Sequence, residues 1–176
     1  CWAYLDSGGT PMIFDNTRSL WRKEPDQTAL IWANGMHPGS TVDPVLRWKG
    51  PLDGTVTLTG QFQDADPGGG DGVTVTIRRN GVALWTRALA NGSAAATFTL
   101  TSPVSREDTF DFVVNRNGDP SWDTTAFEAT LSYAPTPLKV SWGWDNCAAP
   151  LISRLASRAF RRPIRPDELA DYQQLF

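Results

Sequence analysis

The feature of this sequence that most constrains its fold is an alternation of apolar and polar residues with a period of two. In segment 55–62, Val56, Leu58 and Phe62 fall on one face and threonines fall on the other. Successive side chains of a strand point to opposite sides of a sheet, so this pattern indicates one buried and one solvated face. About eight short segments repeat it: 28–33, 45–48, 55–62, 73–78, 82–87, 98–100, 109–114 and 127–133.

Turn residues separate these segments at intervals of about ten residues, which is typical of all-β domains. The clearest turn is Asn80-Gly81, a pair that favours a two-residue hairpin. Of the 176 residues, 40% are hydrophobic and 20% are charged, which is enough apolar material for a packed core. The sequence therefore predicts an all-β fold, an antiparallel β-sandwich of jelly-roll type.

The pattern changes near residue 134, which divides the chain into three predicted parts. The sandwich is expected over 1–134, and its first 27 residues carry turn signals but no clean period. A Pro/Thr-rich linker follows over 135–147. A short C-terminal helical extension is expected over 148–176, where Leu151, Ile152 and Leu155 form one stripe and Pro166 begins a second helix.

The loop that follows the first clear strand is rich in acidic residues and glycine. Asp64, Asp66 and Asp71 lie in it, and Asp123 is expected to join them from another loop. Carboxylate oxygens are the ligands that Ca²⁺ prefers, so the four residues form a candidate calcium site. The spacing does not match an EF-hand, and the alternative is a flexible hairpin loop whose aspartates cap turns.

The chain has eight tryptophans, and their contexts differ. Three lie in expected strands and are assigned to the core: Trp32, Trp48 and Trp85. Three lie in a polar loop or after the linker, where an indole is able to stack on a sugar or on a partner protein: Trp122, Trp142 and Trp144. These three are the candidate ligand-binding residues, while Trp2 and Trp21 remain unassigned.

Charge and histidine content argue against several functions. The net charge of −3 does not favour nucleic acid, and the arginines near the C-terminus are interpreted as a solvated helix face. The single histidine, His37, lies in a turn-rich segment without a nucleophile motif, so a structural role is expected. No pair of carboxylates stands out for hydrolysis, so the sequence predicts no enzyme and no catalytic residue.

Cys1 and Cys147 leave three interpretations open. They form a disulfide that closes most of the chain, as an oxidising compartment would favour. Alternatively, Cys1 is the lipidated first residue of a bacterial lipoprotein, which would be the protein's one direct link to a membrane. In the third interpretation Cys1 is a free thiol at the boundary of a fragment. No apolar run approaches the roughly 20 residues that span a bilayer.

Several short motifs recur in order between residues 37 and 133. They are His37-Pro38-Gly39, Leu46-Arg47-Trp48, Gly69-Gly70-Asp71-Gly72-Val73, Asn80-Gly81, Leu84-Trp85, Phe110-Asp111-Phe112 and Asp123-Thr124-Thr125. This order resembles a β-sandwich module of large secreted bacterial proteins, both planctomycete-type cytochrome-associated proteins and toxin-like proteins with RHS repeats. The module is similar to carbohydrate-binding jelly rolls. The segment 155–169 resembles the start of a helical domain in the planctomycete-type proteins.

We therefore expect a non-catalytic, extracytoplasmic module of a bacterium, secreted, periplasmic or on the cell surface, that binds polysaccharide. The alternative is a structural or interaction subunit of a larger extracytoplasmic or membrane-associated assembly, such as an electron-transfer complex. Calcium is the one cofactor that the sequence suggests.

Overall fold

The computed structural model describes residues 2–136 and Arg165. Within these residues all regular structure is β, and no helix occurs. Apart from Arg165, the predicted helical extension lies outside the described residues, as do Cys1, Cys147, Trp142, Trp144 and almost all of the predicted linker. Within the described part, no helix is long and apolar enough to cross a membrane.

Twelve strands follow one another along the chain. Their bounds are β1 (Trp2–Asp6), β2 (Ile13–Asp15), β3 (Leu20–Arg22), β4 (Leu30–Trp32), β5 (Gly35–His37), β6 (Pro44–Lys49), β7 (Gly54–Asp64), β8 (Val73–Arg79), β9 (Val82–Leu89), β10 (Ala96–Val104), β11 (Thr109–Asn115) and β12 (Thr125–Pro135). All eight segments with the period-two pattern are strands. Asn80 and Gly81 both have positive φ, 49° and 82°, as the predicted hairpin turn between β8 and β9 requires.

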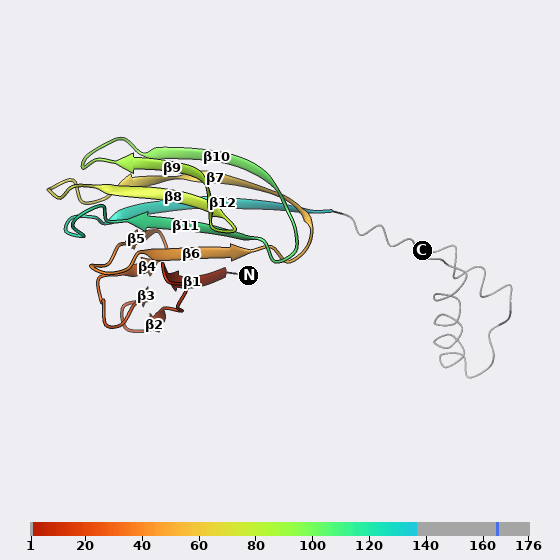
Figure 1. Ribbon diagram of the computed structural model, residues 1–176, viewed down its shortest axis with the longest axis horizontal. Coiled ribbons are helices and arrows are strands. Elements are labelled where there is room, and N and C mark those ends of the chain that lie inside the picture. The colour runs from red at the N-terminus through yellow and green to blue at the C-terminus, as the bar shows by residue number, and fades with distance from the viewer. Residues whose placement is uncertain (1, 137–164, 166–176) are drawn as a thin grey trace. The chain divides into compact units, whose positions relative to one another are not determined.

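The strands form two antiparallel sheets. One has the order β1-β6-β11-β8-β9, and the other has the order β10-β7-β12-β5-β4-β3-β2. The chain crosses between the sheets repeatedly, so strands distant in sequence lie side by side (Figure 1). The fold is an antiparallel β-sandwich, as the sequence predicted.

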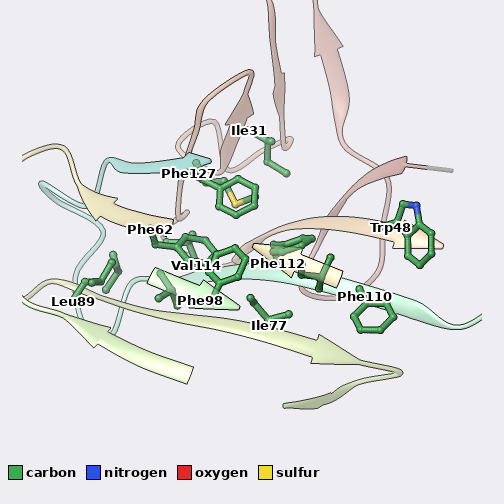
Figure 2. Packing of buried hydrophobic residues seen from close by; sticks show 14 of the residues in the cluster. Ile31, Trp48, Phe62, Ile77, Leu89, Phe98, Phe110, Phe112, Val114 and Phe127 are labelled. Atoms are coloured by element: carbon green, nitrogen blue, oxygen red, sulfur yellow. The ribbon is translucent and has the colours of Figure 1, made fainter. Parts of the chain in front are cut away.

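Aromatic and branched side chains from both sheets fill the space between them. Phe62 of β7, Phe98 of β10, Phe112 of β11 and Phe127 of β12 meet at the centre, and the rings of Phe62 and Phe127 lie 4.7 Å apart (Figure 2). Phe62 and Phe112 are fully buried. These residues belong to the apolar faces of the alternating segments, so the period-two pattern located the core correctly.

Four strands were not predicted: β1, β2, β3 and β5. Three of them have only three residues, which is too short for an alternation to be recognised. Side-chain hydrogen bonds hold the turns between them, because an aspartate readily accepts from main-chain N–H groups two to four residues ahead. Asp6 Oδ1 accepts from Gly8 N at 2.9 Å and from Thr10 N at 2.8 Å.

His37 lies at the end of β5 rather than in a turn. Its Nδ1 atom is 2.7 Å from the carbonyl oxygen of Pro38 and 3.0 Å from that of Thr28. The ring thus links β5 to the segment that leads into β4.

One stretch of β12 has no strand beside it on the β5 side. β12 pairs with β7 along its whole length, from Thr125 to Pro135. On its other side, β5 pairs with it only at Thr125 and Ala126 among the described residues. Beyond Phe127, whose N–H donates to Asn34 O, this edge of β12 is open among the described residues.

Candidate functional site

The described part of the chain contains an aromatic pocket of about 590 Å³. Residues from both sheets line it, from the edge strand β1 on one side to β2, β3, β4 and β12 on the other. Its aromatic walls are Trp2, Tyr4, Phe14, Trp21 and Trp32. Its volume lies within the range of about 300–1,000 Å³ that is usual for small-molecule sites.

Ring stacking fixes one wall of the aromatic pocket. The rings of Tyr4 and Trp21 are nearly parallel, with centroids 4.3 Å apart and an interplanar angle of 8°. Phe14 packs obliquely on Trp21 at 5.0 Å. Trp2 and Phe14 remain 47% and 44% exposed, so their rings present apolar surface to the opening.

An ion pair connects the strands that carry these rings. Lys23, directly after β3, places its Nζ 2.6 Å from Oδ2 of Asp6 at the end of β1. The carboxylate of Asp6 is nearly buried and also holds the turn after β1. The pair thus joins β1 to β3. Asp6 follows Tyr4 by two residues, and Lys23 follows Trp21 by two residues.

A glycine places Trp32 in the aromatic pocket. The six-membered ring of the indole lies across Gly35, and a Cβ on that glycine would come within 2.4 Å of Cζ2. Only glycine leaves room for this arrangement. Trp32 was predicted to be a core residue, but it is only partly buried and lines the pocket. Trp48 is buried as predicted, and Trp85 is partly buried and packs against the core.

Polar groups lie beside these rings. The exposed residues Ser19, Asn34 and Glu128 line the aromatic pocket. The open edge of β12 adds main-chain groups: Phe127 N–H donates to Asn34 O on the β5 side, at 3.0 Å. Main-chain groups two residues apart point to the same side of a strand, so Ala129 N–H and C=O also point to this side. The pocket combines flat apolar surfaces with a few hydrogen-bonding groups.

The structure places Trp122, a predicted ligand-binding residue, in the loop between β11 and β12, outside the aromatic pocket. It has a φ of 65° and is 54% exposed. Gly68 and Gly69 lie against its indole, where an added Cβ would be 3.2 Å from ring atoms. One part of the ring is therefore covered by the glycine-rich loop, and the rest faces solvent.

The four predicted calcium ligands separate into two pairs. Asp64 and Asp123 line a narrow space together with Asn91, which we call the acidic pocket. Asp66 Oδ2 accepts from Thr124 Oγ1 at 2.5 Å, and Asp71 Oδ2 accepts from Gly118 N at 2.9 Å. Among the described residues, no three His, Cys, Asp or Glu side chains form a group that holds a metal by themselves.

Asp123 is a buried carboxyl group with a raised pKa. It is only 2% exposed, and neither carboxylate oxygen has a hydrogen-bond partner in the described part. Burial, followed by the negative charges of Asp71, Asp119 and Asp64, raises its pKa from the usual 3.8 to about 7.

The aromatic pocket was not predicted from the sequence, although a signal was present. Five large aromatic residues, Trp2, Tyr4, Phe14, Trp21 and Trp32, occur within the first 32 positions. This segment lacks the alternation that places aromatic residues in a core. An excess of aromatic residues in an irregular segment is the signal that would have indicated an exposed aromatic site.

No family model matches the chain, and no curated protein matches it. Solved structures with a similar fold include the CBM51 module from Clostridium perfringens GH95 in complex with methyl-galactose, at 11% identity and a TM-score of 0.42, covering 74% of this chain and 84% of that one. Another is the CBM36-1 domain of a multidomain xylanase from the hindgut metagenome of Trinervitermes trinervoides, at 12% identity and a TM-score of 0.38, covering 77% and 100%. Rabbit GITRL reaches 17% identity and a TM-score of 0.39, covering 78% and 97%. The function is therefore argued from the aromatic pocket alone.

Proposed function

We propose that this β-sandwich is a non-catalytic module that binds a saccharide in the aromatic pocket. The observation that carries the proposal is the wall formed by Tyr4, Trp21 and Phe14 in a pocket that the exposed residues Asn34 and Glu128 also line. The C–H faces of a sugar ring pack on aromatic side chains, and its hydroxyl groups need donors and acceptors beside them.

Binding fits the lining better than hydrolysis does. Most glycosidases use two carboxyl groups on either side of the scissile bond. In the described part, the aromatic pocket has one carboxylate among its lining residues, that of Glu128. We therefore assign Glu128 to hydrogen bonding with sugar hydroxyl groups.

A panel of soluble and insoluble polysaccharides tests the proposal, with affinity electrophoresis and pull-down as first readouts and calorimetry on any retained glycan. Trp2→Ala and Phe14→Ala each remove an exposed ring from the aromatic pocket. We expect either change to weaken binding about tenfold or more, which corresponds to about 1.4 kcal/mol. Trp122→Ala is the matched control, because its indole is equally exposed but lies outside the pocket.

The outcomes distinguish the alternatives. Loss of binding in the Trp2 and Phe14 variants, with the Trp122 variant unchanged, supports the aromatic pocket. Loss of binding in the Trp122 variant alone assigns the sugar to the loop between β11 and β12 and contradicts binding in the aromatic pocket. A folded protein that binds no glycan overturns the proposal and favours the interaction-subunit alternative. An extracytoplasmic location in a bacterium and membership of a larger assembly remain part of the proposal.

A further inference from the structure

The acidic pocket lies between three loops, which connect β7 to β8, β9 to β10 and β11 to β12. Three oxygen-bearing side chains line it: Asp64, the last residue of β7, Asn91 of the loop between β9 and β10, and Asp123 of the loop between β11 and β12. These loops are far apart in sequence, and hydrogen bonds join them: Asn91 Nδ2 donates to Gly70 O, and Thr124 Oγ1 donates to Asp66 Oδ2.

The acidic pocket contains acceptors without donors. Both carboxylate oxygens of Asp123 and Oδ1 of Asn91 are buried and have no hydrogen-bond partner in the described part. A buried acceptor left without a hydrogen bond is unfavourable, and more so when it is charged. Three such atoms around one hollow indicate a missing partner that accepts no hydrogen bond and carries positive charge.

A hydrogen bond from the nitrogen of the Asn91 side-chain amide fixes the orientation of that amide. Its Nδ2 donates to the main-chain carbonyl oxygen of Gly70 at 3.0 Å. Exchanging nitrogen and oxygen would place two acceptors against each other, so Oδ1 is the atom left over. An amide oxygen and two carboxylates then border the same space.

The charges around the acidic pocket are of one sign. Asp71, Asp119 and Asp64 lie close enough to Asp123 to repel its carboxylate, and no Lys or Arg is among the described residues that line the pocket. The carboxylate of Asp64 is partly neutralised by main-chain donors: Asp66 N at 2.9 Å and Gly92 N at 2.6 Å. No such donor reaches Asp123.

The donor set selects the class of cation. All of these ligands are oxygen atoms, which excludes the nitrogen and sulfur environment that Zn²⁺ prefers. Because no three acidic side chains converge, an amide and main-chain oxygens must complete the shell. Ca²⁺ accepts such mixed shells of six to eight oxygens, whereas Mg²⁺ requires a near-ideal octahedron and keeps several waters.

We propose that the acidic pocket binds Ca²⁺ through the carboxylates of Asp123 and Asp64 and through Oδ1 of Asn91, with main-chain oxygens or water completing the shell. The ion joins the three loops at one end of the sandwich. Asp66 and Asp71 are not ligands in this arrangement: they hold Thr124 and Gly118, which shape the loop that carries Asp123.

Titration of the full chain with CaCl₂ after EDTA treatment, in the absence of any saccharide, tests the site by calorimetry and by thermal unfolding. We expect one bound ion, a higher Tm with Ca²⁺ than with EDTA, and a change in tryptophan fluorescence because Trp122 borders the acidic pocket. Mg²⁺ at the same concentration should leave Tm within a degree or so of the EDTA value.

Two variants and a matched control identify the ligands. Asp123→Asn and Asn91→Ala should each weaken Ca²⁺ binding at least tenfold, and Asp123→Asn should not lower Tm in EDTA, since it removes an unpaired buried charge. Asp119→Asn removes a nearby exposed charge but no ligand, so the affinity of this variant for Ca²⁺ should change by only a few fold. Equal Tm values in Ca²⁺ and EDTA, with no heat of binding, overturn the proposal and identify Asp123 as a neutral buried acid. Because no sugar is present, this outcome leaves the proposed saccharide site unaffected.

Discussion

Arg47 and Asp111 pair side by side on adjacent strands, joined by two hydrogen bonds. Arg47 Nε donates to Oδ1 at 2.6 Å and Nη2 donates to Oδ2 at 2.8 Å, and the two residues are direct partners in the β6–β11 register. The carboxylate of Asp111 is almost completely buried. It lies on the face of β11 opposite Phe110 and Phe112, so its charge is compensated outside the main core.

Replacing Arg47 should destabilise the fold. Arg47→Met keeps most of the side-chain volume but leaves the buried carboxylate of Asp111 without its two donors. We expect the free energy of unfolding to fall by about 2 kcal/mol, measured by urea denaturation at pH 7. Arg18→Met, in an exposed turn, should change it by less than about 0.5 kcal/mol. Equal stability of the two variants would mean that the pair contributes nothing.

Asp108 should make the stability of the fold depend on pH in the acidic range. Hydrogen bonds from Ser105 N, Asn80 Nδ2 and Arg79 lower its pKa from the usual 3.8 to about 2. A carboxylate with a depressed pKa contributes its full stabilisation above the unfolded value and loses it as pH falls through the folded value. The urea midpoint should therefore fall between about pH 4 and pH 2. Asp108→Asn should show a smaller fall over that interval, and an identical slope in both proteins would contradict the assignment.

Gly35→Ala should damage the aromatic pocket. The new Cβ would lie within 2.4 Å of the Trp32 ring and 3.0 Å from the carbonyl oxygen of Thr125, so the indole must move. We expect a loss of about 1–3 kcal/mol of stability, together with weaker binding of any glycan that the parent chain retains. Near-ultraviolet circular dichroism should report the displaced tryptophan, and an unchanged spectrum would argue against its position over Gly35.

Two glycines with positive φ should respond unequally to alanine. At Gly81, with φ 82°, an added Cβ meets no atom within 4 Å, so Gly81→Ala carries only the backbone cost of about 1–2 kcal/mol. At Gly72, with φ 74°, the Cβ would come within 2.2 Å of Leu89 O. Thermal unfolding should therefore show a clearly larger loss for Gly72→Ala, and a similar loss in both would contradict the contact.

The sequence predicted the long strands because their energetics are local and periodic. Val56, Leu58 and Phe62 alternate with threonines, and burial of one face follows directly from that alternation. β2 and β5 could not be predicted, because three residues carry no period. The pairing of β2 with β3 depends on a turn held by Asp15, which accepts from Thr17 N and Arg18 N.

The candidate site was harder to predict than the fold. Asp64 and Asp123 were named together from the sequence, and the structure brings them to one pocket, but Asn91 gave no signal because a single asparagine in a loop is common. The aromatic pocket depends on Tyr4 stacking against Trp21 across two short strands, a contact that no local pattern encodes. Side chains from loops and strands that are distant in sequence meet only after the chain has folded.

The open edge of β12 affects how the aromatic pocket can change in evolution. Part of its polar surface is the main chain at Ala129, next to walls made of side chains. Mutation replaces side chains but leaves peptide groups in place. Descendants of this sequence can therefore exchange Trp2, Phe14 or Glu128 and acquire a new preference, while the same peptide N–H and C=O continue to orient whatever enters.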